Sequence, residues 1–127
     1  MSGEFSFNVE PERDLVRIRM GGFFTPEDIE AFLAARTEAH RQLRCGPNQH
    51  LTLNDLRDMK IQAQEIVDSF RAMLAAPEYR SRRLAFVIGP TLARTQLSRA
   101  LDWRVARCFD DPWSAEAWLF SESRYAA

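Results

Sequence analysis

Cysteine, long apolar runs and net charge are all scarce in this sequence, and each scarcity argues against a class of protein. The two cysteines, Cys45 and Cys108, have no CxxC spacing of the kind that metal and redox sites use. No apolar run reaches the ~18 residues that a membrane-spanning helix needs. The segment MSGEFSF at the start lacks the basic and apolar regions of a signal peptide. We therefore expect a cytoplasmic protein with reduced thiols and no membrane span.

Charge and catalytic motifs are equally sparse. The formal net charge is −1, so no overall field favours nucleic acid or an anionic membrane. The sequence contains no P-loop, no GxGxxG and no GxSxG motif. His40 and His50 lack the spaced cysteines or carboxylates of a metal site, and no Cys-His-Asp order suggests a nucleophile. We expect packed or capping roles for the histidines and cysteines, no metal or other cofactor and no catalytic residues. An enzyme of another type stays open, because sequence alone does not display active-site geometry.

What remains is the composition of an ordinary globular domain. The chain has 127 residues, of which 46% are hydrophobic, so we predict a single domain spanning residues 1–127 with one substantial core. Apolar residues alternate with polar ones in 5–9 and again in 15–20, around the turn segment EPERD. This pattern predicts an antiparallel hairpin with one buried face and one polar face.

The rest of the chain alternates between predicted helices and strands. Thr25, Pro26 and Asp28 have the spacing of a helix start, and Gly46 is a candidate stop. The segment LTLND predicts a short strand ending at Asp55, and apolar spacing over 63–74 predicts an amphipathic helix. Four further elements are predicted: a buried strand at 84–88, a third helix capped by Thr91, a peripheral strand at 104–109, and a last helix opened by Asp111 and Pro112.

The predicted order is β-β-α-β-α-β-α-β-α. Alternating strands and helices favour right-handed crossovers between parallel strands. We therefore predict an α/β fold with a five-stranded mixed sheet, an N-terminal antiparallel hairpin followed by parallel strands, and about four helices.

This order resembles the STAS superfamily, and more closely the small bacterial SpoIIAA-like proteins, which are related to the CRAL-TRIO lipid-binding fold. The segments LNDLRDMKIQAQEIVDSFRAML, LAFVIGPTLARTQLSRA and CFDDPWSAEAWLF carry the resemblance. It covers roughly residues 5–120 and depends on the order of elements rather than on a diagnostic motif.

The resemblance implies a switch residue that this sequence does not have. In the phosphoregulated members, a Ser at the start of the helix after the Asp-ended strand takes a phosphate, which a helix N-terminus favours. Asp55 matches the strand-end position, but no Ser or Thr lies between Asp55 and Gln64. Ser69 comes too late in the helix. The resemblance therefore implies a module that is not controlled by phosphorylation at the usual position.

Two groups of polar residues are candidate sites. A ligand or partner could bind at the carboxyl edge of the predicted parallel strands. The candidates for this rim are Asn54, Asp55, Arg57, Asp58, Lys60 and Thr91. The simpler interpretation, which we favour, is turn chemistry and surface ion pairs of little energetic value.

A second group is basic and could meet an acidic partner or a phosphate. Its members are Arg80, Arg82, Arg83, Arg94 and Arg99. Nucleic acid is not expected, because interleaved aromatics and a recognition helix are both missing. A solvated charged surface is the favoured interpretation. Trp103 and Trp113 could be exposed anchors for a partner, or could cover a sheet edge, whereas Trp118 is expected in the core.

These observations lead to two functional hypotheses besides an enzyme. The first is a non-enzymatic module that binds a protein partner or itself, possibly as a homodimer, since an unpaired edge strand must be protected. The second, suggested by the likeness to the CRAL-TRIO fold, is a binder of a small apolar ligand or lipid. The nine phenylalanines and three tryptophans could line a cavity, but they could equally fill an ordinary core.

Overall fold

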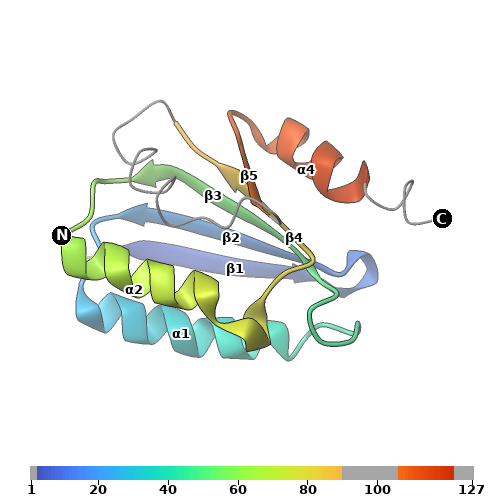
Figure 1. The fold of residues 1–127 in the computed structure, drawn as a ribbon, viewed down its shortest axis with the longest axis horizontal. Coiled ribbons are helices and arrows are strands. Elements are labelled where there is room, and N and C mark those ends of the chain that lie inside the picture. Colours follow the sequence, from blue (N-terminus) through green and yellow to red (C-terminus); the bar gives the residue numbers. More distant parts are fainter. Residues whose placement is uncertain (1–2, 90–105, 122–127) are drawn as a thin grey trace.

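The computed structural model describes residues 3–89 and 106–121 (Figure 1). The described strands are β1 (Glu4–Glu10), β2 (Leu15–Gly22), β3 (Leu51–Met59), β4 (Arg83–Val87) and β5 (Ala106–Phe109). The helices are α1 (Pro26–His40), α2 (Gln64–Ala75) and α4 (Pro112–Ser121), with short 3₁₀ turns at Pro11–Arg13 and Pro77–Tyr79. None of the helices in these ranges is long and apolar enough to cross a membrane.

The five strands form one mixed sheet in the order β1-β2-β3-β4-β5. β1 and β2 pair antiparallel, with Phe7 opposite Ile18, and every later pair is parallel. The predicted hairpin and mixed sheet are therefore confirmed. The expected helix count is corrected: the described residues contain three α-helices rather than about four. The helix predicted after Thr91 lies outside the described residues.

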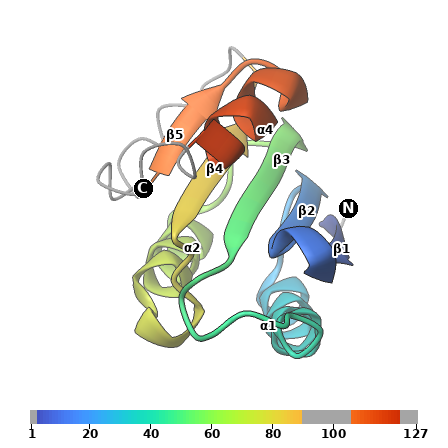
Figure 2. The same cartoon turned by 90° about the vertical axis from the view of Figure 1, so that its right-hand side faces the viewer.

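The sheet separates two apolar layers. Figure 2 shows α1 and α2 on one face and α4 on the other. Strand alternation sorts the side chains: Val16, Ile18 and Met20 of β2 pack in the cluster that includes α1 and α2 residues, whereas Leu15 belongs to the cluster completed by Leu119 of α4. The continuous apolar run of β4 contributes to both layers, as its lack of alternation predicts.

The start of α1 follows its sequence signal, whereas its end does not. Thr25 Oγ1 accepts a hydrogen bond from the Asp28 backbone N–H at 3.2 Å, and Asp28 accepts one from the Thr25 N–H at 2.9 Å. The helix ends at His40 instead of near Gly46. Its last turn tightens into i to i−3 hydrogen bonds, from Gln42 N–H to Ala39 O and from Leu43 N–H to His40 O, which close the helix early.

Candidate functional site

Most of the predicted rim lies inside a strand. β3 does not stop at Asp55 but continues to Met59, so the short strand predicted from LTLND is corrected. The extension forms because β2 runs alongside it to Gly22, which pairs with Met59 after an irregularity between Arg19 and Gly21. Asp58 is therefore a strand residue, and the connection to α2 is only a few residues long.

The charged rim residues pair with neighbouring strand residues. Arg57 donates from Nε and Nη2 to both oxygens of Asp55, at 3.0 and 2.7 Å, and Arg19 pairs with Asp58 on the adjacent strand. Burial opposes ionisation of Asp55, but the hydrogen bonds from Arg57 outweigh it and lower the pKa of that carboxyl. The rim charges are thus mutually neutralised. Lys60 is exposed, and its backbone N–H donates to Gly22 O at 3.1 Å.

Asn54 differs from the rest of the rim. Only 9% of Asn54 is exposed, and its Oδ1 is buried without a hydrogen-bond partner. It shares a strand face with Thr52, two residues before it, whose hydroxyl bonds into the layer covered by α1 and α2. Its backbone lies between Ile18 and Phe86 in the sheet. The structure therefore removes Asn54 from the solvent-facing rim.

Sequence reasoning missed a structural residue in the segment where the phosphorylatable Ser was sought. Gln62 is 7% exposed, and its Oε1 accepts a hydrogen bond from the Phe24 N–H at 2.8 Å. Its Nε2 donates to Gly22 O at 2.9 Å and to Lys60 O at 2.6 Å. Gln62 therefore ties the connection after β2 to the connection after β3. In the sequence, only its position just before the predicted helix marked it.

The α2 helix that follows begins without a capping side chain. Ala63 occupies the N-cap position with extended backbone, and no side chain there accepts from the first turn. We expect Ala63→Ser to raise the free energy of unfolding by about 0.5–1 kcal/mol by supplying that acceptor. Urea unfolding at pH 7 measures the gain, with Ala75→Ser at the far end of α2 as a matched control that leaves stability within about 0.5 kcal/mol. Equal shifts in the two variants would count against a capping effect.

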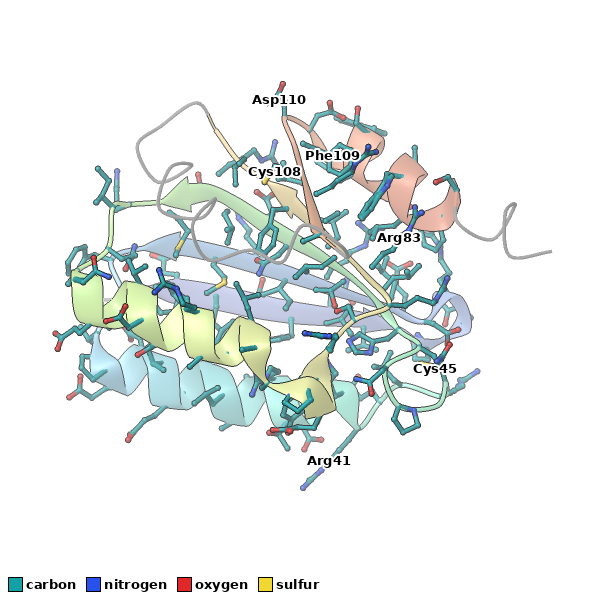
Figure 3. The ribbon with its side chains drawn as sticks, in the orientation of Figure 1. Arg41, Cys45, Arg83, Cys108, Phe109 and Asp110 are labelled. Carbon is teal, nitrogen blue, oxygen red and sulfur yellow. The ribbon has the colours of Figure 1, made fainter. Side chains whose placement is uncertain are left out.

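The described arginines of the predicted basic surface contact different parts of the fold. Arg83 extends toward α4 (Figure 3), where Nη1 donates to Trp118 O at 2.8 Å and the guanidinium covers the Trp118 ring at 4.5 Å. Arg82 instead donates from Nε to Gln49 O at 3.2 Å. Arg80 is exposed. The three arginines therefore do not form a single patch.

Three predicted site residues cannot be placed. Thr91 of the rim, and Arg94 and Arg99 of the basic surface, lie outside the described residues. Trp103 does as well.

Large exposed apolar side chains follow the ends of three strands. Phe23 comes directly after β2, Ile61 follows β3, and Trp113 begins α4 after β5, with exposed fractions of 43%, 47% and 81%. Because β2, β3 and β5 run parallel, their ends lie at the carboxyl edge of the sheet (Figure 1). Trp113 is thus exposed, while Trp118 packs against Phe109 with ring centroids 5.7 Å apart.

A buried polar cluster lies at the opposite, amino end of the parallel strands. His40 at the end of α1 and His50 just before β3 face each other with their Nε2 atoms 3.2 Å apart. His50 Nε2 is also 3.3 Å from Ser81 Oγ, which lies 2.6 Å from Thr52 Oγ1. His50, Thr52 and Ser81 are all at least nine-tenths buried. The sequence offered one signal, the alternation of polar residues at 50, 52 and 54 with Leu51 and Leu53.

Hydrogen-bond directions in this cluster argue against a serine nucleophile. His40 Nδ1 lies 2.8 Å from Arg36 O, and since a carbonyl only accepts, His40 carries its proton on Nδ1 when neutral. His40 Nε2 is then an acceptor, so the proton between the rings belongs to His50 Nε2. That nitrogen has no lone pair with which to take a proton from Ser81.

The remaining chemistry-bearing residues are dispersed. Figure 3 shows Cys45, a free thiol, in the loop before β3 and Cys108 on β5. Burial raises the pKa of the Cys45 thiol, which makes it a poorer nucleophile. Across residues 3–89 and 106–121, no group of three or more His, Cys, Asp or Glu side chains could hold a metal ion.

Comparison with known proteins identifies the fold. No protein-family model matches the chain, and no curated protein does. Among solved structures, the chain is similar to an uncharacterised protein of the DUF3478 family from Shewanella loihica PV-4, which is described as having a SpoIIAA-like fold. The match has a TM-score of 0.68 at 14% identity and covers 93% of this chain and 94% of the other. This is an α/β protein of SpoIIAA-like fold, as the order of elements predicted.

Proposed function

We propose that this protein is a non-enzymatic, cytoplasmic interaction module that docks a protein partner at the carboxyl edge of its sheet. The observation that carries the proposal is the position of Phe23, Ile61 and Trp113, the large exposed apolar side chains of the described residues, at one edge. Exposed aromatics of this size are the usual anchors of protein interfaces. A SpoIIAA-like fold supports a module of the STAS type in general.

The charges at the same edge favour an apolar docking mode. Asp55 is paired with Arg57, and Asp58 with Arg19, so little net charge faces a partner. Arg57 also lies close enough to Asp111, beside Trp113, to lower the pKa of that carboxyl further, after its hydrogen bonds from Ser114. Because the charges around Trp113 are paired, a partner can exclude water from this side chain at a low free-energy cost.

The same segment supports an unphosphorylated mode of action. The chain has no Ser or Thr between Asp55 and Gln64, and Gln62 there is committed to backbone groups. Partner binding at this edge would therefore be constitutive with respect to that modification. The direction of the His50 hydrogen bond, which denies Ser81 a base, supports the non-enzymatic part of the proposal.

An apolar-ligand function has weaker support. The phenylalanines of the layer covered by α1 and α2 pack on one another. The ring centroids of Phe7 and Phe32 are 5.0 Å apart, and those of Phe24 and Phe70 are 5.6 Å apart. Rings in mutual contact fill a layer, whereas a ligand cavity needs them to stand apart.

Site-specific crosslinking tests the docking edge. A photoreactive phenylalanine analogue replacing Trp113, or Ile61, should form a defined adduct with one partner in cells of the source organism. The same analogue replacing Glu38, exposed in the last turn of α1, should not. Trp113→Ala should weaken the identified complex by at least ~2 kcal/mol, roughly 30-fold in Kd. An adduct of twice the chain mass would indicate self-association instead, and no adduct, or equal adducts at all three positions, would contradict the proposal.

A further inference from the structure

We propose that Arg36, stacked on Tyr79, anchors a binding site for an oxyanion, the carboxylate or phosphate group of a small molecule. The site lies near the amino ends of β3 and β4, at the opposite end of the strands from the docking edge, and it does not depend on the proposed function. Arg36 is in the third turn of α1, and Tyr79 ends the 3₁₀ turn that follows α2.

The first observation is an unsatisfied N–H donor on the Arg36 guanidinium. The Arg36 Nε atom is buried and has no hydrogen-bond partner. Within the part of the chain that the structure describes, Arg36 forms no ion pair. Its one directed contact is with the Tyr79 ring, whose centroid lies 4.0 Å from the guanidinium carbon. Arg36 as a whole is partly buried. A buried N–H donor without a partner is costly, so a native site of this kind calls for a missing acceptor.

The second observation is that the guanidinium is held in place for such an acceptor. Thr37 Oγ1 donates to Leu33 O at 3.2 Å, so the 3.1 Å contact between Thr37 Oγ1 and the Tyr79 hydroxyl must use the Tyr79 proton. That bond fixes the ring on which Arg36 stacks. His40, one turn later, packs edge-on to the same ring at 5.0 Å and donates to Arg36 O.

The charges around the site favour an anion. Burial lowers the pKa of Arg36, and the nearest acidic groups acting on it, Tyr79 and Glu78, only partly offset this. Glu78 is exposed, and the neighbouring Arg80 adds positive charge. No carboxylate of the described residues forms an ion pair with Arg36, and His40 is a neutral neighbour at pH 7 because burial lowers its pKa.

Chemistry narrows the ligand class to oxyanions. A planar guanidinium presents N–H groups in a fixed fork that matches two oxygens of a carboxylate or phosphate. The same positive charge disfavours a metal ion, and no group of three or more His, Cys, Asp or Glu side chains in the described residues could hold one. A purely apolar ligand would leave the Arg36 Nε–H without an acceptor. It would therefore not remove the free-energy cost of burying that donor unpaired.

Nuclear magnetic resonance of the arginine Nε–H signals tests the site in the intact protein. Sodium phosphate and sodium acetate are titrated separately at constant ionic strength, with sodium chloride as the balancing salt. We expect the Arg36 Nε–H signal to shift saturably with at least one of the two anions, and the stronger of the two responses identifies the phosphate or carboxylate class.

Matched variants make the test specific. Arg36→Lys keeps the charge but loses the planar fork, and we expect it to weaken binding at least tenfold, as should Arg36→Gln. Arg41→Gln removes an arginine that projects from the end of α1 and pairs with exposed Glu38 (Figure 3), and binding should be unchanged. The backbone amide spectrum of each variant confirms folding. A shift that does not saturate with either anion, or binding that Arg36→Lys and Arg41→Gln alter equally, would overturn the proposal.

Discussion

Acidification from pH 7 to pH 4 is expected to lower the free energy of unfolding by about 3 kcal/mol through His50 alone. Burial, followed by the proximity of His40, lowers the pKa of His50 from an ordinary 6.5 to about 4. Between pH 6.5 and about 4, the unfolded chain therefore binds a proton at this histidine, whereas the folded chain does not. Stability from this group is fully present above pH 6.5 and is lost as the pH falls toward 4.

The facing ring adds to this loss in the same direction. Burial, and the charge of Arg36, lower the pKa of His40 against a hydrogen bond to Arg36 O that favours the charged form. Only one proton fits between the two Nε2 atoms, which lie 3.2 Å apart. A proton added to His40 Nε2 would place two donors against each other and break the contact between α1 and the start of β3.

Urea unfolding at pH 7, 6, 5 and 4 measures the effect, with His50→Gln as the comparison. Gln offers an N–H toward His40 Nε2 and has no group that titrates in this range. Paired carboxylates such as Asp55 and Glu116, whose pKa values are lowered, weaken both proteins alike in acid. The wild type should therefore lose more stability than the variant between pH 6.5 and 4. Parallel pH curves would show that His50 does not titrate as its burial requires.

Local signals in the sequence were enough for most of the fold. The capping residues Thr25 and Asp28 lie three positions apart, and the apolar spacing of α2 lies within a few turns, so both could be read without knowing any partner. The alternation in β2 likewise located both of its faces. Element order then sufficed to predict a SpoIIAA-like sheet.

The features that escaped prediction depend on residues distant in the sequence. β3 runs past Asp55 because β2 continues beside it, which LTLND does not reveal. Arg83 separates from Arg82 because Arg83 begins β4 and bonds to α4, whereas Arg82 precedes the strand and bonds to Gln49 O. The His40–His50 contact requires α1 to end early, and the Arg36–Tyr79 stack joins residues on either side of β3 and α2. No local pattern encodes such pairings.

Replacing Gln62 with Leu is expected to lower the free energy of unfolding by about 2–4 kcal/mol. Leu has a similar volume, so the change mainly removes hydrogen bonds. The Phe24 N–H, which donates to Gln62 Oε1 at 2.8 Å in a buried setting, would lose its acceptor, and the carbonyls of Gly22 and Lys60 would lose a donor. An unpaired buried N–H accounts for about 1–3 kcal/mol by itself.

Two matched variants separate the acceptor from the donors. Gln62→Glu keeps an oxygen for the Phe24 N–H but cannot donate to Gly22 O or Lys60 O, and its buried charge should destabilise the protein further. Gln64→Leu, two residues on, alters an exposed side chain bonded to Asp68 at 3.0 Å and should change stability by less than about 0.5 kcal/mol. Urea unfolding at pH 7 compares all three. If Gln62→Leu lowered the free energy of unfolding no more than Gln64→Leu, the hydrogen bonds by which Gln62 joins the two connections would not contribute to stability. A large loss would mean that the hydrogen bonds of Gln62 stabilise the connection between β3 and α2, in which Ile61 is exposed to a partner.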